Sequence, residues 1–355
     1  MATPKFSGTP ASFHAELKKR INAYFEQKGK TTTGNFQLFS KALILFTSLI
    51  IVYTHLVFFT PALIFQILES ILLGGLVAAI GFNIMHDGAH GSFSKYPWMN
   101  RIAAYSLNIL GGSSYMWNIK HNVIHHAYTN VDGVDDDIDI QPWMRMSLTQ
   151  KKYSLHRYQH IYFWVLYALL YIFWIFFLDY NKYFRRKIGV MPLNNMDTKD
   201  HITFWGFKLL HIFVFVALPI YAMGFLPWLT SFLIFTLVAG LVLSLVFQLA
   251  HTVENTAFPV PDAHTGKLED EWAIHQLKTT SNFATRNKFV NWFVGGLNFQ
   301  IEHHLFPKIS HVHYPALSEI VRKACQEYGI PYLEYPRVRY AIASHVSFLK
   351  EMGRS

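Results

Sequence analysis

The stretch ALIFQILESILLGGLVAAIGFNIMHDGAH, residues 62–90, joins an apolar segment to two histidines. Residues 62–85 are almost wholly apolar, and about 20 such residues are enough for a helix to cross a bilayer. His86 and His90 follow directly. Residues four apart on a helix share a face, with roughly 6 Å of axial rise between them. The stretch therefore predicts a membrane helix that extends beyond the bilayer and carries two histidines pointing into one pocket.

The composition indicates a membrane protein. Of 355 residues, 52% are hydrophobic and only 15% are charged, against roughly 25% in a soluble domain. No linker rich in Pro, Gly or Ser divides the chain, so we expect one integrated domain over residues 1–355. Residues 1–40 are polar and basic and do not resemble a cleavable signal peptide, so membrane entry is expected from internal spans. The net charge of +9 suits a cytoplasmic flank better than a nucleic-acid site, because the basic residues lie beside apolar segments.

Four apolar stretches are predicted to be transmembrane helices, at 42–59, 62–85, 203–223 and 226–250. The first two are joined by little more than Thr60-Pro61, and the last two by Gly224-Phe225. Neither link carries a charge, so the four stretches form two helical hairpins. Most lysines and arginines lie at the open ends of the hairpins, which the positive-inside rule places in the cytoplasm.

A fifth stretch, 161–178, is of borderline length and is rich in Tyr and Trp. If it crossed the membrane, the histidines after 62–85 would lie opposite those that follow 226–250, and no shared site could form. We therefore expect 161–178 to lie in the membrane interface. The predicted fold is an all-α integral membrane protein with four transmembrane helices as two hairpins and a cytosolic helical cap that holds a histidine-rich site.

Six more histidines extend the pattern begun by the first pair. They are His121, His125 and His126 in HNVIHH, His303 and His304 in QIEHH, and His251 directly after the apolar stretch 226–250. Imidazole is the commonest metal ligand among side chains, and eight exceed the need of one ion, so the pattern predicts two metal ions. All-nitrogen ligation excludes calcium and magnesium and leaves zinc, iron, copper or manganese. Zinc seldom takes more than four ligands, whereas open positions at more highly coordinated ions suit oxygen chemistry at iron.

Other polar residues are expected to have structural roles. The single cysteine, Cys325, excludes an internal disulfide and a cysteine-ligated cluster, and is predicted to be buried. Histidines outside the clusters are expected to be ordinary surface or hydrogen-bonding residues. Polar side chains inside the apolar stretches are expected to snorkel or to bond between helices; they are His55, Glu69, Lys208 and His211.

Several polar residues beside the clusters are candidates for orienting the imidazole rings, namely Asp87, Glu254, Asn255, Asn298 and Glu302. The acidic run DDDID at 135–139 is expected to be a solvated loop, with a role beside the metals left open for one of its carboxylates. The basic residues at 182 and 185–187 suit a cytoplasmic flank, or alternatively the phosphates of a lipid or CoA head group.

The three motifs together resemble the histidine boxes of the membrane fatty acid desaturase family. They are His86-Asp-Gly-Ala-His90, His121-Asn-Val-Ile-His125-His126 and Gln300-Ile-Glu-His303-His304. The resemblance covers roughly residues 40–315, and the three boxes in this order are highly specific. Gln300 at the head of the third box is similar to the front-end group of delta-5, delta-6 and linoleoyl-CoA desaturases, whereas most other members have histidine there.

The resemblance implies that the eight histidines bind two iron ions, with His251 matching the family's ligand beyond the last span. Gln300 would be a ninth, weaker ligand or a neighbouring donor. The implied reaction is O2-dependent introduction of a cis double bond into an acyl chain on CoA or a lipid, with no catalytic residue beyond the metal ligands. The alternatives are a hydroxylase that uses the same site, or a metal transporter or sensor, although the spans lack a continuous row of polar residues.

The sequence departs from the eukaryotic front-end enzymes in one respect. Those enzymes carry a fused cytochrome b5 domain with a His-Pro-Gly-Gly motif, and no His-Pro pair occurs here. We therefore expect electrons from a separate protein, such as ferredoxin or cytochrome b5. The expected location is the bacterial inner membrane, with the active site on its cytoplasmic side.

Overall fold

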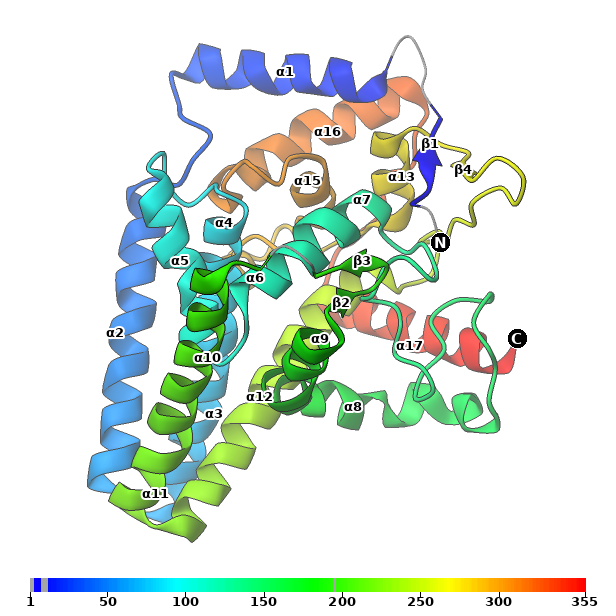
Figure 1. Ribbon diagram of the computed structural model, residues 1–355. Helices are drawn as coiled ribbons and strands as arrows, with labels where there is room; N and C mark the ends of the chain where they lie inside the picture. Colours follow the sequence, from blue (N-terminus) through cyan, green and yellow to red (C-terminus); the bar gives the residue numbers. More distant parts are fainter. Residues whose placement is uncertain (1–2, 8–11, 194–195) are drawn as a thin grey trace.

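The computed structural model describes residues 3–7, 12–193 and 196–355, and it is mostly helical (Figure 1). Four long helical segments run alongside one another and form the body of the molecule. They are α2 (Phe36–Phe59), α3 (Leu63–Ile80), α10 with α11 (Thr198–Ile212 and Leu218–Met223, joined by a π-helical turn at Phe213–Ala217), and α12 (Phe225–His251). Helices suit this composition because they satisfy their backbone hydrogen bonds internally, as a chain in hydrocarbon must.

Five helical segments are long and apolar enough to cross a membrane, judged by length and composition. They are Phe36–Phe59, Leu63–Ala89, Ser154–Arg185, Thr198–Met223 and Phe225–His251. Four of them match the predicted stretches, and the two hairpin links are as short as expected. The first and fourth begin before their apolar stretches because polar caps precede them: Asn35 accepts hydrogen bonds from the backbone of α2, and Asp197 caps α10.

The fifth segment has a different direction. It comprises a 3-10 turn (Ser154–Tyr158), α8 (Gln159–Phe173), a π-helical turn (Trp174–Leu178) and α9 (Asp179–Arg185). In Figure 1, α8 runs across the direction of α2 and α3. It packs closely on α12 at Gly240, where a Cβ atom would lie 2.2 Å from the carbonyl oxygen of Ala168. The C-terminal helix α17 (Val338–Arg354) packs on the same segment.

Most of the remaining elements surround one end of the helical body. The helices are α1 (Phe13–Lys28), α4 (His86–Ala89), α5 (Pro97–Ile109), α6 (Ser114–Trp117), α7 (His126–Tyr128), α13 (Trp272–Thr279), α14 (Lys288–Phe293), α15 (Gln300–Leu305) and α16 (Tyr314–Tyr328), with a 3-10 turn at His311–His313. Three two-stranded ladders pair β1 (Lys5–Phe6) with β4 (Lys267–Leu268), β2 (Lys187–Ile188) with β3 (Met191–Pro192), and β5 (Asn282–Phe283) with β6 (Glu334–Tyr335). These two-residue strands are the only departure from the predicted all-α class among the described residues.

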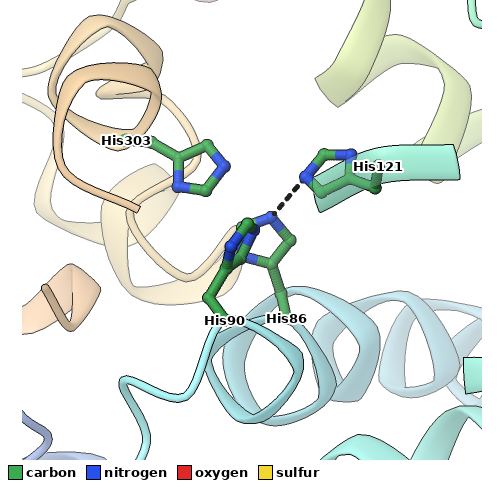
Figure 2. Close-up of side chains that lie close together, drawn as sticks. All are labelled: His86, His90, His121 and His303. Carbon is green, nitrogen blue, oxygen red and sulfur yellow. Dashed lines mark hydrogen bonds between the residues drawn. The ribbon is translucent and has the colours of Figure 1, made fainter. Parts of the chain in front are cut away.

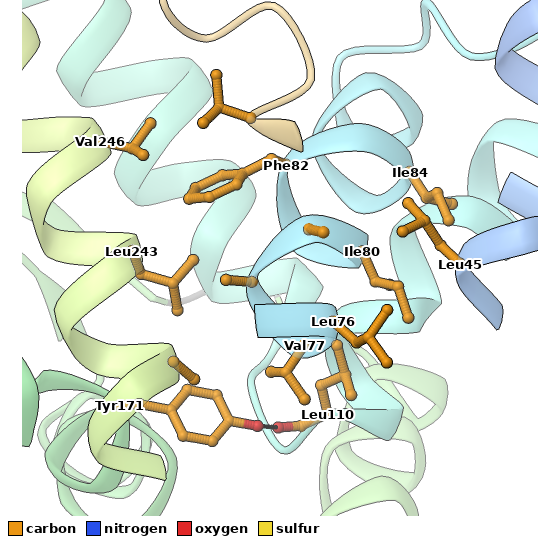
Figure 3. Packing of buried hydrophobic residues seen from close by; sticks show 14 of the residues in the cluster. Leu45, Leu76, Val77, Ile80, Phe82, Ile84, Leu110, Tyr171, Leu243 and Val246 are labelled. Carbon is orange, nitrogen blue, oxygen red and sulfur yellow. Dashed lines mark hydrogen bonds between the residues drawn. The ribbon is translucent and has the colours of Figure 1, made fainter. Parts of the chain in front are cut away.

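Two apolar clusters fix the position of the histidines. The larger lies between α3 and α12 and includes Val77, Ile80 and Leu243 (Figure 3). The second joins α1 to α13, α15 and α16 through side chains such as Leu17 and Leu317, and Cys325 is buried within it as predicted. Because α15 carries two of the histidines, this second cluster holds them over the ends of the long helices.

Candidate metal centre

The first pair of histidines lies where α3 ends. After Ile80 the helix widens into a π-helical turn, Gly81–Met85, and resumes as α4 with His86 as its first residue. His86 and His90 are both buried, and their ring centroids are 4.6 Å apart. The two rings therefore share one pocket, as their spacing predicts.

The second cluster lies on a helix of a form that the spacing alone does not predict. Residues Asn118–His125 are π-helical and lead into α7. A π-helix hydrogen-bonds from residue i to residue i+5, so residues five apart come onto one face. His121 and His126 are five apart, and their Nε2 atoms lie 3.1 Å from each other. An ordinary α-helix would bring only His121 and His125 together.

His251 and the third cluster approach from other directions. His251 is the last residue of α12. His303 and His304 lie on α15, whose first turn is anchored by Asn282: its side-chain oxygen accepts from the Ile301 backbone N–H at 2.9 Å. The Asn282 amide also donates to Glu302 at 2.8 Å. Burial raises the pKa of the Glu302 carboxyl to about 7, against the opposing effect of this hydrogen bond.

The structure brings all eight histidines into one buried region. Ring nitrogens of His86, His90, His121 and His303 lie within 4.8 Å of one another (Figure 2). A second group within the same limit contains His125, His251 and His304, and a third contains His126 with His303 and His304. Two neighbouring centres, with His126 close to both, are therefore available.

Most of these rings have one nitrogen without a hydrogen-bond partner among the described residues. The unpaired buried atoms are Nε2 of His90, His125, His251, His303 and His304, and Nδ1 of His126. His121 Nε2 faces two other ring nitrogens, 3.3 Å from Nε2 of His86 and 3.1 Å from Nε2 of His126. A nitrogen of a neutral ring either donates or accepts a hydrogen bond, so these three close nitrogens cannot all be paired with one another by hydrogen bonds.

The opposite nitrogen of four rings is held from outside the cluster. Nδ1 of His125 lies 3.0 Å from Asp135 Oδ2, and Nδ1 of His304 lies 2.8 Å from Gln276 Oε1. Nδ1 of His303 lies 3.0 Å from the Tyr314 hydroxyl. Nδ1 of His251 lies 3.2 Å from the Thr279 carbonyl oxygen. Each contact fixes the ring's orientation and leaves Nε2 free to face inward, which is the usual arrangement around a metal-binding histidine.

Burial governs the charge of the cluster. It lowers the pKa of His121, His126, His303 and His304 well below the ordinary value, and neighbouring imidazoles lower it further, so these rings are neutral. Burial also lowers the pKa of His125, but the carboxylates of Asp135 and, to a smaller extent, Asp137 outweigh this effect and the net shift is upward. Neutral imidazole is the form that binds metals.

The acidic run at 135–139 is not the solvated loop that we expected; instead one of its carboxylates, Asp135, contacts a clustered ring, which is the alternative that the sequence left open. Asp135 is 1% exposed and also accepts a hydrogen bond from the Asn130 backbone N–H. Lys120 Nζ lies 2.8 Å from Asp137 Oδ1, and Lys182 Nζ lies 3.0 Å from Asp136 Oδ2. One member of the basic flank is therefore paired with this run, and the run itself is tied to the histidines.

The residues expected to orient the rings are replaced by others. Asp87 bonds to Ser310, Asn298 to the Ala284 carbonyl, and Glu302 to Asn282 and Tyr332. Glu254 and Asn255 form no hydrogen bond to a clustered ring among the described residues. The groups that contact the rings from outside the cluster include Asp135, Asp137, Thr129, Gln276, Thr279 and Tyr314. Gln276, Thr279 and Tyr314 lie on segments that no histidine motif marks.

Gln300 and the polar residues of the long helices lie outside the eight-histidine cluster or at its edge. Gln300 is buried at the start of α15, and its amide nitrogen has no hydrogen-bond partner among the described residues. Within the described chain, no histidine outside the eight joins a group close enough to share a metal ion. His55 pairs with Glu69 at 2.9 Å, and Lys208 pairs with Asp179 at 2.9 Å. These polar residues thus bond between helices, as expected.

A donor set of this kind fits transition-metal ions. Eight buried imidazoles are gathered, six of them with a ring nitrogen that has no hydrogen-bond partner among the described residues, and outer hydrogen bonds fix four of the rings. The family model for fatty acid desaturases matches residues 62–336, a range that includes all eight. The chain belongs to the fatty acid desaturase family. It is therefore an oxidoreductase of lipid metabolism that desaturates fatty acyl chains.

Curated relatives match over nearly the whole chain. The sn-1 linoleoyl-lipid 6-desaturase of Arthrospira platensis is 38% identical over 348 residues, which cover 98% of this chain and 94% of that protein. The enzyme of the same name from Synechocystis sp. is 37% identical over 350 residues, 97% of this chain and 96% of that protein. The acyl-lipid (8-3)-desaturase of Physcomitrium patens is 35% identical over 347 residues, 96% of this chain and 72% of that protein.

Proposed function

We propose that the eight clustered histidines bind two iron ions, and that the enzyme uses O2 to introduce a cis double bond into the acyl chain of a membrane lipid. The observation that carries this proposal is the set of six buried imidazole nitrogens in the cluster that have no hydrogen-bond partner among the described residues. His86, His90, His121 and His303 would hold one ion, and His125, His251 and His304 the other, with His126 near both. Gln300 is proposed as a ninth, weaker ligand or a neighbouring donor.

The chemistry divides between the metals and the protein. Bound iron would supply the oxidising power, with O2 and two electrons, that removes two hydrogens from unactivated neighbouring methylenes. The chain's own residues orient the imidazoles, exclude water through burial, and hold the hydrocarbon chain next to the centre. An apolar pocket that includes His86 in its wall, described below, is suited to this last task.

The lipid substrate is supported by the relatives. Two of them are named for a linoleoyl lipid, and a third for an acyl lipid. We therefore expect a linoleoyl lipid to be converted at position 6, and we place CoA-bound substrate second. Electrons would come from a separate protein such as ferredoxin or cytochrome b5.

A topology with four spans accounts for the path of the chain. Thr149 Oγ1 lies 2.6 Å from Asp132 Oδ2, just before the segment Ser154–Arg185 begins. Lys182, near the end of that segment, bonds to Asp136 of the same loop. Both ends are thus tied to one loop next to the metal centre, which supports an interfacial position. We infer that four helices cross the membrane, that the site faces the cytoplasm, and that the membrane is a bacterial inner membrane.

The proposal is tested by expressing the chain in a host without polyunsaturated lipids, supplying linoleic acid, and locating new double bonds by mass spectrometry. The purified protein is expected to contain two iron ions per chain. His125→Ala should abolish the product and lower the iron content, whereas His264→Ala, at an exposed position outside the cluster, should change neither.

Three results would contradict the proposal in different ways. A product that gains oxygen, in place of losing two hydrogens, would make the enzyme a hydroxylase. Protein that contains one zinc ion and no iron would overturn the metal assignment. Metal flux into vesicles without oxygen consumption would favour a transporter.

A further inference from the structure

An apolar pocket lies between the metal centre and the helical body. One wall is formed by α3 and the π-helical turn after it, from Val77 through Phe82 to His86. Leu243 and Phe247 of α12 form the facing wall. From Val77 to His86 the wall is about 13 Å long at the usual helical rise. The lining therefore has a histidine at one end and is long enough to lie along part of a hydrocarbon chain.

The far end of the pocket is formed by the turn between α5 and α6. Leu110 of this turn and Tyr171 of α8 both line the pocket, and the Tyr171 hydroxyl donates a hydrogen bond to the Leu110 carbonyl oxygen (Figure 3). Both residues are almost fully buried. The end wall thus joins two segments that are distant in the sequence.

Side chains bind three successive carbonyl oxygens of this turn. In addition to Tyr171 at Leu110, His211 Nδ1 lies 3.2 Å from the Ile109 carbonyl oxygen. Lys208 Nζ donates to the Gly111 carbonyl oxygen at 2.6 Å. Unpaired backbone carbonyls are costly in an apolar surrounding, so three such bonds hold the turn firmly in place.

The groups that bind the turn are themselves anchored. Lys208 pairs with Asp179 at 2.9 Å and bonds to the Ile175 carbonyl oxygen at 3.1 Å. Gly111 has φ +97°, and a Cβ atom there would lie 2.8 Å from the His211 ring. Glycine is therefore required for the ring to approach, and the turn cannot easily move away from α10.

We propose that this clamped turn, residues 109–112 held by Tyr171, Lys208 and His211, ends the acyl-chain pocket and thereby determines which chain lengths the enzyme accepts. The inference rests on the proposed function, because it takes the ligand of the pocket to be the acyl chain. Tyr171 and Leu110 are specificity-determining residues, and Lys208 and His211 are positioning residues that act through the turn.

The first test changes the pocket at its wall and at its end. Gly81 lines the pocket with an ordinary helical backbone, and a Cβ atom there would lie 3.8 Å from Leu243, so Gly81→Ala narrows the pocket without strain. Leu110→Ala deepens it. A methylene in a hydrophobic pocket changes selectivity by roughly tenfold or more, so these two variants are expected to shift the product ratio of long to short acyl chains in opposite directions.

Matched controls separate this effect from general destabilisation. Gly75→Ala adds the same methyl group to α3 outside the pocket, where it meets only Phe293 at 3.9 Å. Tyr171→Phe removes the bond to Leu110 and should broaden the chain-length range. Tyr167→Phe removes a buried hydroxyl of the same helix that bonds to His345, outside the pocket, and should leave the range unchanged. Identical product ratios in wild type, Gly81→Ala and Leu110→Ala would overturn the inference while leaving desaturation intact.

A second measurement does not require turnover. A linoleoyl lipid with a photoreactive diazirine at its methyl end is cross-linked to the purified enzyme in nanodiscs, and the labelled peptides are identified. Labels on residues 109–112 and on Tyr171 are expected, in wild type and in inactive His125→Ala alike. Labels confined to the lipid-facing surface of α2 would overturn the inference. Because the cross-link needs no turnover, this result would count equally in the inactive variant.

Discussion

At the scale of single residues, Asp135 is the nearer of two carboxylates that contact His125 Nδ1, with Asp137 Oδ2 3.3 Å from the same nitrogen. Asp135 Oδ2 lies 3.0 Å from His125 Nδ1, and the side chains of Asp135 and His125 are both buried. The charge fixes the ring and increases the basicity of the inward nitrogen. Asp135→Asn should therefore reduce iron affinity or activity by about 10–100-fold. Chelator titration followed by metal analysis measures the affinity, and product yield measures the activity.

The same acidic run offers a control for this prediction. Asp139 is exposed, and no ring of the cluster bonds to it. Asp139→Asn removes the same charge from the loop and should leave iron content and product yield at the wild-type level. Equal losses in both variants would show that the loop's charge matters as a whole and that the contact to His125 does not.

The residues that hold the rings from other helices mark the limit of what the sequence predicts at this scale. The eight histidines were found from their spacing and from the apolar stretches that precede them. Gln276 and Tyr314 were not, because they reach His304 and His303 from α13 and α16, and no local pattern links a glutamine or tyrosine to a ring on another helix. These contacts depend on tertiary packing.

At the scale of elements, the sequence predicts where helices lie better than it predicts their form. Hydrophobic length located the long helices because a membrane span needs a fixed number of apolar residues. The π-helix at Asn118–His125 was missed, since its local composition resembles that of an α-helix. The difference has a consequence for the site, because the wider helix brings His126 beside His121.

Gly240 allows α8 and α12 to approach each other closely. At Gly240 a Cβ atom would lie 2.2 Å from the Ala168 carbonyl oxygen, which is backbone and cannot rotate away. Gly240→Ala should lower the free energy of unfolding by about 1–3 kcal/mol, the usual cost of overpacking. At Gly206 of α10 nothing lies within 4 Å of such an atom. Gly206→Ala should instead raise stability by about 0.5–1 kcal/mol through helix propensity. Unfolding of the purified protein in detergent compares the two.

The attachment of α17 should depend on pH. His345 is fully buried between the Tyr167 hydroxyl, 2.8 Å from Nε2, and the Thr252 carbonyl oxygen, 2.6 Å from Nδ1. Burial lowers the pKa of His345 to about 4, below its value of about 6.5 in an unfolded chain. The unfolded state therefore takes up the proton first. The contribution of His345 to stability is complete above pH 6.5 and falls by about 2 kcal/mol by pH 5.

A variant without a titrating group isolates this contribution. His345→Gln keeps a side chain that can donate and accept hydrogen bonds, and its stability should change less between pH 7 and pH 5 than that of wild type. His264→Gln, at an exposed position, should keep the wild-type slope. Parallel pH profiles for wild type and His345→Gln would show that the buried ring does not carry this dependence.

At the scale of the whole molecule, the sequence predicts the arrangement of hairpins and their shared site, since eight histidines can meet only if they emerge on one side. It does not predict how the cap is assembled. Helices α1, α13 and α16 close over α15 through apolar contacts between distant segments, which no periodicity encodes. That the chain forms a single integrated domain over residues 1–355 stays a prediction.

The position of the segment Ser154–Arg185 decides the topology, because it is long and apolar enough to cross a membrane. Lys151 and Lys187 flank it and are exposed, and the native Cys325 is buried, so single cysteines can be labelled against a low background. With four spans, Lys151→Cys and Lys187→Cys should both resist a membrane-impermeant maleimide in intact cells and react after permeabilisation. Thr60→Cys, in the link between α2 and α3, should react in intact cells.

A fifth crossing would instead make only one of the two flanking positions reactive from outside. A fifth crossing would also put the two ends of this segment on opposite sides of the bilayer. One loop could then not reach both ends, so the hydrogen bonds from Thr149 to Asp132 and from Lys182 to Asp136 could not both form. The labelling pattern and the loop contacts therefore test the same topology independently.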